Sequence, residues 1–348
     1  MRTFMSAVIV LLVIAVIPNI TTGWAQEDTT PTPTFAPPKT ATPTTVVQAI
    51  EPTAQVTTEA SSSTALTEPL TQADLNILTG NVQRPNGLAW FNNRLYTACN
   101  GDYTVYELDD RTGASVTYIY GVRNMHALYP EQDANGGLVI WAPDFQSNTF
   151  VRVTRSGVET ISQGLQGPWG IGRIDDNSFV VSNITGDNVV SITRTGGMRE
   201  AISNMRSPTG IAVDGEYVYV ANNGSARRAV EWFNLSALSS PTPVDAESTD
   251  ANYSLITGLQ NPTGLALGTD GYLYVAYSLG TRGVVGRVNP ATCRENGGCT
   301  NDQVEIVLYT ELAAPLAGLT LSPDMRLFVH TMFSPDIYWA QVGEPATT

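Results

Sequence analysis

The sequence predicts an all-β protein, a six-bladed β-propeller of four-stranded blades, and three observations carry that prediction. A motif of proline, one variable residue, glycine and a short apolar run recurs, as in "SPTGIAV" (207–213) and "NPTGLAL" (261–267). Further runs rich in Val, Ile, Tyr and Thr, bounded by turn residues, follow each copy and are typical of strands. The last unit lacks its fourth strand, whereas an extra strand pattern precedes the first unit.

The position of the motif's glycine sets the spacing of the units. Six residues occupy this position: Gly87, Ala127, Gly170, Gly210, Gly264 and Gly318. A repeat of about 40–50 residues that contains four strands is typical of a propeller blade. The first strand of a blade lines the crowded central axis. We therefore expect the glycine to let the backbone turn in without a side chain, and the proline to fix the approach.

The two ends of the predicted ring match each other. The sixth unit stops after its third strand pattern, "IYWAQV" (337–342), and "ADLNILTG" (73–80) is a fourth-strand pattern with no preceding three. We expect residues 75–78 to pair with 337–342, because this pairing completes the last blade and hides the edges of the ring.

The N-terminal residues predict export. Residues 1–25 resemble a signal peptide, with Arg2 followed by an apolar run of eleven residues that is too short to span a bilayer. Residues 26–70 are rich in Thr, Pro and Ser and predict a disordered linker or stalk. The propeller is expected over 71–343, with a tail at 344–348. We expect a secreted or cell-surface protein that contacts a membrane only if the signal segment stays uncleaved.

Charge and cysteine content narrow the classes of partner. The net charge is −14 and the isoelectric point is near 4.5, which excludes nucleic acid as a partner because phosphate binding needs clustered Lys and Arg. We expect a monomer.

Cys293 and Cys299 flank a turn sequence, and export permits a disulfide between them. Cys99 ends an apolar run and is expected to be a buried free thiol.

The repeats resemble the NHL-repeat superfamily of six-bladed propellers, which includes the SMP-30/gluconolactonase-like proteins. The stretches that carry the resemblance are "PTGIAVDGEYVYVAN" (208–222) and "PTGLALGTDGYLYVAYS" (262–278), and the pattern extends over about 71–343. In the lactonase-like members a Glu ahead of an early first strand binds an axial divalent metal, together with Asn and Asp from other blades. The corresponding position here is Asn86, with no Glu. The resemblance therefore implies the fold, and it does not decide the activity.

Strand alternation places several polar and aromatic residues at one mouth of the predicted ring. The start of each first strand and the loop after each second strand open on the same face. The candidate ligand-binding residues there are Asn86, His126, Trp169, Asn183, Asn222 and His330. His126 and His330 are the only histidines of the chain, and they are candidates for a catalytic base or a metal ligand. The alternative is that they line a wet channel.

The cofactor is unknown from sequence, although a divalent cation such as Ca²⁺ fits some of the residue types. The candidate ligands are Asn86, Asp102, Asp144 and Asp187, because carboxylate and amide oxygens suit Ca²⁺. The alternative is that these aspartates bind their own loop backbone.

Two functions remain open at this stage. The first is a secreted or surface-displayed binding or scaffold module, with no chemistry, that takes an unknown small molecule, glycan or protein at the mouth. The second is a metal-dependent hydrolase of a lactone or a similar small ester. The missing axial Glu and the presence of only two histidines favour the first.

Overall fold

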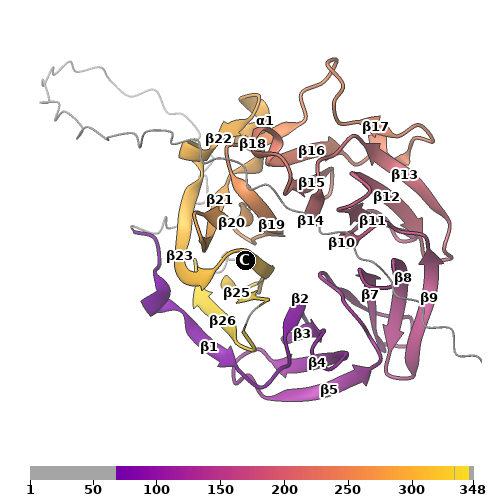
Figure 1. Ribbon diagram of the computed structural model, residues 1–348, viewed down its shortest axis with the longest axis vertical. Helices are drawn as coiled ribbons and strands as arrows, with labels where there is room; N and C mark the ends of the chain where they lie inside the picture. Colours follow the sequence, from indigo (N-terminus) through magenta and orange to yellow (C-terminus); the bar gives the residue numbers. More distant parts are fainter. Residues whose placement is uncertain (1–67, 333, 345–348) are drawn as a thin grey trace, which may run out of the picture. The chain divides into compact units, whose positions relative to one another are not determined.

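The computed structural model describes residues 68–332 and 334–344, which form six β-sheets arranged around a central axis (Figure 1). The prediction of a six-bladed propeller with four-stranded blades is confirmed. The predicted signal peptide (1–25), almost all of the predicted linker (26–70) and most of the predicted tail (344–348) lie outside the described residues. Within the described part, no helix is long and apolar enough to cross a membrane.

In each blade the four strands are antiparallel and follow one another outward from the central axis. Blades 1 to 3 consist of β2 (Pro85–Phe91), β3 (Arg94–Cys99), β4 (Thr104–Asp109) and β5 (Ser115–Tyr120); β6 (Tyr129–Gln132), β7 (Leu138–Asp144), β8 (Thr149–Thr154) and β9 (Gly157–Gln163); and β10 (Pro168–Arg173), β11 (Ser178–Asn183), β12 (Asn188–Thr193) and β13 (Met198–Ser203). Blades 4 to 6 consist of β14 (Pro208–Val213), β15 (Tyr217–Asn222), β16 (Val230–Asn234) and β18 (Ser254–Thr257); β19 (Gln260–Leu267), β20 (Leu273–Leu279), β21 (Arg282–Val288) and β23 (Glu305–Ala313); and β24 (Leu316–Leu321), β25 (Arg326–Thr331), β26 (Ile337–Gln341) and β1 (Asn76–Thr79).

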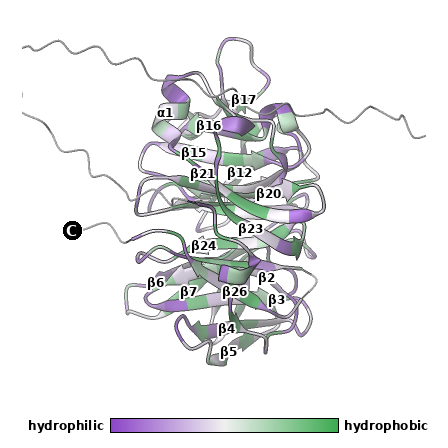
Figure 2. Cartoon of the chain, turned by 90° about the vertical axis from the view of Figure 1, so that its left-hand side faces the viewer, coloured by the Kyte–Doolittle hydropathy of each residue, from purple (hydrophilic) through white to green (hydrophobic). Residues whose placement is uncertain are grey.

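The hydrophobic core lies between adjacent blades. Alternating strand residues face the neighbouring sheet, so that the largest fully buried side chains include Phe150, Phe179, Tyr219 and Tyr274. Figure 2 shows apolar residues along strands such as β24 and hydrophilic residues at the short helix α1 (Pro290–Glu295). This alternation follows from the period of two along a strand.

The ring closes through the predicted pairing of the chain's two ends. β1 runs antiparallel to β26, with Asn76 opposite Trp339 and Ile77 opposite Tyr338. Leu78 is 8% exposed and packs in a cluster with residues of both blade 6 and blade 1, whereas Ile77 is 62% exposed. A strand from the N-terminal end therefore joins the last blade to the first.

The closure can be tested with two neighbouring residues of β1. We expect Leu78→Ala to lower the free energy of unfolding by about 2 kcal/mol, because it removes buried methyl groups from the cluster between blades 6 and 1. Ile77→Ala on the exposed face serves as the matched control and should change stability by less than about 0.5 kcal/mol. Urea unfolding measures both. Equal effects of the two variants would contradict the closure.

The glycine of the repeated motif lies where a side chain has no room, as predicted, and the structure shows which atoms crowd it. None of these motif glycines has a positive φ, so the turn itself does not demand glycine. A Cβ on Gly170 would lie 2.3 Å from the carbonyl oxygen of Thr209, and one on Gly210 would lie 2.6 Å from that of Thr263. Each glycine thus allows the first strand of the next blade to approach closely.

Two insertions between third and fourth strands extend neighbouring blades. β17 (Val244–Asp245), from the blade 4 insertion, pairs in parallel with β13, and β22 (Cys299–Thr300), from the blade 5 insertion, pairs in parallel with β18. Each insertion therefore covers part of the outer edge of the preceding blade. The remaining helical turns are short: η1 (Gln72–Asp74), η2 (Ala226–Arg228), η3 (Ala237–Ser239) and η4 (Asn301–Gln303).

The cysteines lie as predicted. Cys293 and Cys299 form a disulfide that links α1 to β22. Cys99 is a buried free thiol at the end of β3, and desolvation raises its pKa to about 12. Because the thiolate is the reactive form, this cysteine is unreactive at neutral pH.

Candidate functional site

The starts of the innermost strands and the ends of the second strands lie at one mouth of the propeller, as the strand alternation predicts. Pro85 at the start of β2 is paired with Cys99 at the end of β3, and the same arrangement pairs Pro168 with Asn183. The variable residues of the motif therefore gather around the axis on one face. Most of them are buried against the adjacent blade, and the contacts that they make differ around the ring.

Polar side chains of blades 3 to 5 bind the backbone of the next blade. The Ser182 hydroxyl donates to the carbonyl oxygen of Thr209 at 2.5 Å. The Thr209 hydroxyl donates to the carbonyl oxygen of Pro262 at 2.9 Å, and the Thr263 hydroxyl donates to that of Leu316 at 2.7 Å. The two threonines are at most 3% exposed. They hold the ring together and offer little to a ligand.

The contacts continue from blade 6 through blade 1 to blade 2. Nε2 of His330 lies 2.7 Å from the backbone oxygen of Asn86, and this contact makes Nε2 the protonated nitrogen of a neutral ring. The Asn86 amide donates to Oδ1 of Asn124 at 2.5 Å. His330 is fully buried and Asn86 is 2% exposed. Two of the predicted ligand-binding residues are therefore joined in one chain of hydrogen bonds between blades.

An aromatic cluster links blades 2 and 3 at the mouth. The ring of His126 stacks on Trp169 with 3.6 Å between centroids and 5° between planes. Phe145 meets both rings edge-on, at 5.3 Å from His126 and 6.1 Å from Trp169. His126 is 7% exposed, and its Nδ1 is buried with no hydrogen-bond partner. Trp169 and Phe145 remain partly exposed. This cluster combines a partly exposed aromatic surface with one buried ring nitrogen, Nδ1 of His126, that has no hydrogen-bond partner.

Asn183 and Asn222 support the loops that lead into the innermost strands. Oδ1 of Asn183 accepts a hydrogen bond from the backbone of Gln166 at 3.1 Å, and Oδ1 of Asn222 accepts one from the backbone of Arg206 at 3.1 Å. The amide of Asn222 also donates to Glu231 at 2.5 Å. Both side chains are nearly fully buried. The two predicted ligand-binding residues therefore have structural partners in the same position of successive blades.

The predicted metal ligands lie in loops of separate blades. Asp144 accepts from the backbone of Gln146 at 3.0 Å, and Asp187 accepts from the backbone of Ser207 at 2.7 Å. Asp102 accepts from the Tyr106 hydroxyl at 2.5 Å. Over residues 68–332 and 334–344, no three His, Cys, Asp or Glu side chains converge in a way that could hold a metal ion. Ca²⁺ binding stays a prediction.

Burial keeps both histidines neutral. Desolvation, together with the nearby His330, lowers the pKa of His126 to about 3. Desolvation likewise lowers the pKa of His330 to about 4. A neutral imidazole carries one donor and one acceptor, so the buried Nδ1 of His126 has one unused hydrogen-bonding position, which a ligand can reach only if the ring moves. Neither ring is poised to exchange a proton near neutral pH.

These shifts predict a loss of stability in mild acid. Unfolded histidines take up protons below about pH 6.5, whereas the folded rings stay neutral far below that, so the stabilisation is present above pH 6.5 and is lost as the pH falls. The two histidines together should cost about 2.5 kcal/mol between pH 7 and pH 5.5. His126→Gln and His330→Gln should each remove about half of that pH dependence in urea unfolding. An unchanged dependence in both variants would contradict the burial argument.

Sequence reasoning missed three residues at the mouth. Phe145 and Asn124 lie one residue after Asp144 and two before His126, and Ser182 precedes Asn183. Phe145 completes the aromatic cluster, while Asn124 and Ser182 bind the neighbouring blade. A signal existed for all three, because each one borders a residue that the repeat already places at the mouth.

No protein-family profile and no curated protein matches the sequence at a significant level. Solved structures do match. A gluconolactonase of Xanthomonas campestris superposes with a TM-score of 0.58 at 14% identity, covering 77% of this chain and 89% of its own. Regucalcin, a calcium-binding protein of Agrobacterium tumefaciens, gives 0.55 at 12% identity, covering 80% and 99%. A streptogramin B lyase gives 0.50 at 14%, covering 76% and 96%.

These likenesses show the fold that this chain shares with the gluconolactonase-like and lyase propellers. The resemblance predicted from the repeats is thereby confirmed at the level of architecture. At these identities the activities named for those proteins do not transfer to this chain.

Proposed function

We propose that this protein is a secreted or surface-displayed binding propeller whose ligand docks on the aromatic cluster of His126, Trp169 and Phe145. The observation that supports the proposal is that the side chains at the mouth fall into two sets with different contacts. Polar side chains of blades 3 to 6 bind the next blade, and two partly exposed rings remain beside one unpartnered nitrogen. The first set builds a scaffold, and the second offers a surface for recognition.

The chemistry of the cluster favours a ligand with a flat apolar face and one polar group. Aromatic rings bind such faces through stacking and edge contacts, and they lose little conformational entropy on binding. The unpartnered Nδ1 of His126 is buried, so a hydrogen bond from it to the ligand requires the ring to move on binding. Sugars and aromatic side chains of peptides both present this combination, so the ligand is a glycan, a peptide segment or a small molecule of that shape.

The test is a binding screen of the purified full chain against glycans, aromatic peptides and small lactones, followed by titration of any hit. We expect Trp169→Ala to weaken binding at least tenfold, while Trp232→Phe on blade 4, outside the cluster, leaves the affinity unchanged. Binding that persists in Trp169→Ala would reject the cluster as the site.

The same preparation decides the alternative, a metal-dependent lactone hydrolase. Metal analysis and hydrolysis of the lactones would be run in parallel. Stoichiometric Ca²⁺ or Zn²⁺, together with turnover that Asn86→Ala abolishes, would replace the binding proposal by the hydrolase. Asn86→Ala also removes the hydrogen bond to Asn124. The circular dichroism spectrum and the unfolding curve of this variant therefore serve as the control for misfolding.

A further inference from the structure

On the face opposite the mouth, arginines lie in several of the spaces between adjacent blades. Arg155 follows β8 and lies over the Tyr118 ring of blade 1 at 4.7 Å. Arg194 follows β12, lies 5.0 Å from the Trp141 ring of blade 2 and pairs with Glu131. Arg294 of the blade 5 insertion lies 3.7 Å from the Tyr217 ring of blade 4.

The space between blades 3 and 4 departs from this pattern at two equivalent positions. Leu235 follows β16 as Arg194 follows β12, and each donates its backbone N–H to the residue before the second strand of its own blade. Ile174 follows β10 at the position that Glu131 holds in blade 2, as the strand registers show. An ion pair in one space is therefore replaced by an apolar pair in the next.

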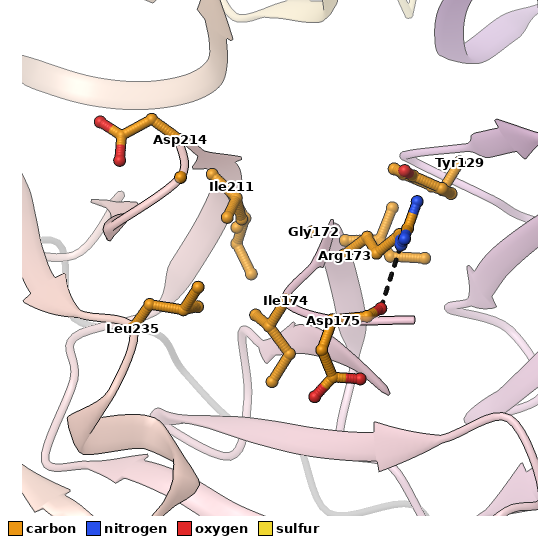
Figure 3. A pocket seen from close by; sticks show the side chains of 11 residues that line it. Tyr129, Gly172, Arg173, Ile174, Asp175, Ile211, Asp214 and Leu235 are labelled. Carbon is orange, nitrogen blue, oxygen red and sulfur yellow. Dashed lines mark hydrogen bonds between the residues drawn. The ribbon is translucent and has the colours of Figure 1, made fainter. Parts of the chain in front are cut away.

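An open groove of about 420 Å³ lies between blades 3 and 4. The hollow between blades 2 and 3 has a similar volume, about 450 Å³, but Glu131 and Arg194 line it, so the two spaces differ in the chemistry of their lining. Its apolar lining comprises Ile171, Ile174, Ile211, Val213 and Leu235. Figure 3 shows Ile174, Ile211 and Leu235 directed toward a common space. A second hollow of about 540 Å³ shares Ile174 and Leu235 and continues the groove toward Ser236 and Ser239.

Carboxylates outnumber cations at the margin of the groove. Asp175, Asp214 and Glu216 line the groove and make none of the ion pairs among the described residues. The carboxylates of Asp175 and Asp214 accept hydrogen bonds from their own turns and from the Tyr219 hydroxyl, which also accepts from Arg294. Arg173 donates to the backbone oxygen of Asp175 at 3.0 Å. Arg173, the cation of the lining, pairs with Asp176 outside it. Three carboxylates therefore surround an apolar floor.

We propose that this groove docks a segment of a partner protein that presents a large apolar side chain flanked by lysine or arginine. The apolar side chain would occupy the position that arginines and aromatic rings occupy between blades 1 and 2, 2 and 3, and 4 and 5. The flanking cations would pair with Asp175, Asp214 and Glu216, so that binding weakens as salt is added. This surface lies on the opposite face from the aromatic cluster, so the proposal stands independently of the function proposed above.

The test uses the full chain with ¹³C-labelled isoleucine δ1 methyl groups and three capped pentapeptides. The peptides are Lys-Leu-Lys-Leu-Lys, Glu-Leu-Glu-Leu-Glu and Lys-Ser-Lys-Ser-Lys. We expect the first to shift the methyl signals of Ile174 and Ile211 in a saturable way. The acidic peptide should bind at least tenfold more weakly, and the serine peptide should give no saturable shift at these methyl groups.

Two variants and a matched control locate the binding. Leu235→Arg restores the residue type that blades 2 and 3 carry and should lower the affinity at least tenfold. Val158→Arg on β9 makes a similar exchange on the outer edge of blade 2 and should leave the affinity unchanged. Glu216→Gln should weaken the binding of the basic peptide and leave the binding of the other peptides unchanged. Because Glu216 is exposed, this variant keeps the test open if Leu235→Arg does not fold.

Several outcomes would overturn the proposal. These are the absence of saturable binding, equal affinity for the basic and acidic peptides, or binding unchanged by both Leu235→Arg and Glu216→Gln. Methyl shifts that grow with protein concentration in the absence of peptide, together with a dimer in sedimentation, would instead assign the groove to a second copy of the chain.

Discussion

Gly170→Ala should lower the free energy of unfolding by about 3 kcal/mol, at the upper end of what one added methyl group does in a packed interior. The new Cβ would lie 2.3 Å from the carbonyl oxygen of Thr209 and 3.0 Å from the backbone nitrogen of Ile211. Both atoms belong to the innermost strand of the next blade, so relief requires blades 3 and 4 to move apart. The Thr209 oxygen also accepts the Ser182 hydroxyl, which such a movement would disturb.

Gly157→Ala is the matched control for this prediction. Gly157 begins β9, has no heavy atom within 4 Å of a built Cβ and does not have a positive φ. Its replacement should leave stability unchanged or raise it slightly, because alanine restricts the unfolded chain. Urea unfolding with the two variants in parallel gives the comparison. If Gly170→Ala were as stable as Gly157→Ala, close approach of the blades would not be the reason for the motif.

The fold was predictable because the same local pattern of strands and turns recurs six times along the chain. The same run of strand patterns recurs with each motif glycine, and the unmatched patterns at 75–78 and 337–342 fix how the ring closes. Such signals depend on sequence order alone. The crowding at the glycine was predictable, but its clash partner, Thr209 for Gly170, was not, because that residue lies on another blade.

The candidate site was predictable in position and less so in role. Strand alternation correctly placed His126, Trp169 and Asn183 at the mouth. It could not show that Asn183 supports the backbone of Gln166, or that His126 stacks on Trp169, because these contacts depend on side-chain direction and on the distance between blades. Equivalent positions in a repeat thus share a location, while each one acquires its own partners.

Arg326→Met should produce the largest loss of stability, about 4 kcal/mol, because it removes the buried cation of a buried carboxylate and leaves it only the exposed Arg111 at 3.9 Å. Nη2 of Arg326 lies 2.7 Å from Oδ2 of Asp110, and the two side chains are 3% and 6% exposed. Asp110 also accepts the indole N–H of Trp90 at 2.6 Å, so it cannot turn toward water without breaking a second contact. The pair joins blade 6 to blade 1, where the ring closes.

A double-mutant cycle separates the ion pair from the packing of the arginine stem. Asp110→Asn in the Arg326→Met background removes the uncompensated charge and should recover more than half of the loss, with a coupling energy of about 2 kcal/mol. The control is Arg282→Met, which breaks an exposed pair with Glu311 and should change stability by no more than about 1 kcal/mol. Urea unfolding at pH 7 measures the two single variants, Arg326→Met and Asp110→Asn, the double variant and the control. If the double variant were no more stable than Arg326→Met, the loss would come from the packing of the arginine stem against Phe328, whose ring lies 5.2 Å from the guanidinium, and the buried charge would not hold the ring closed.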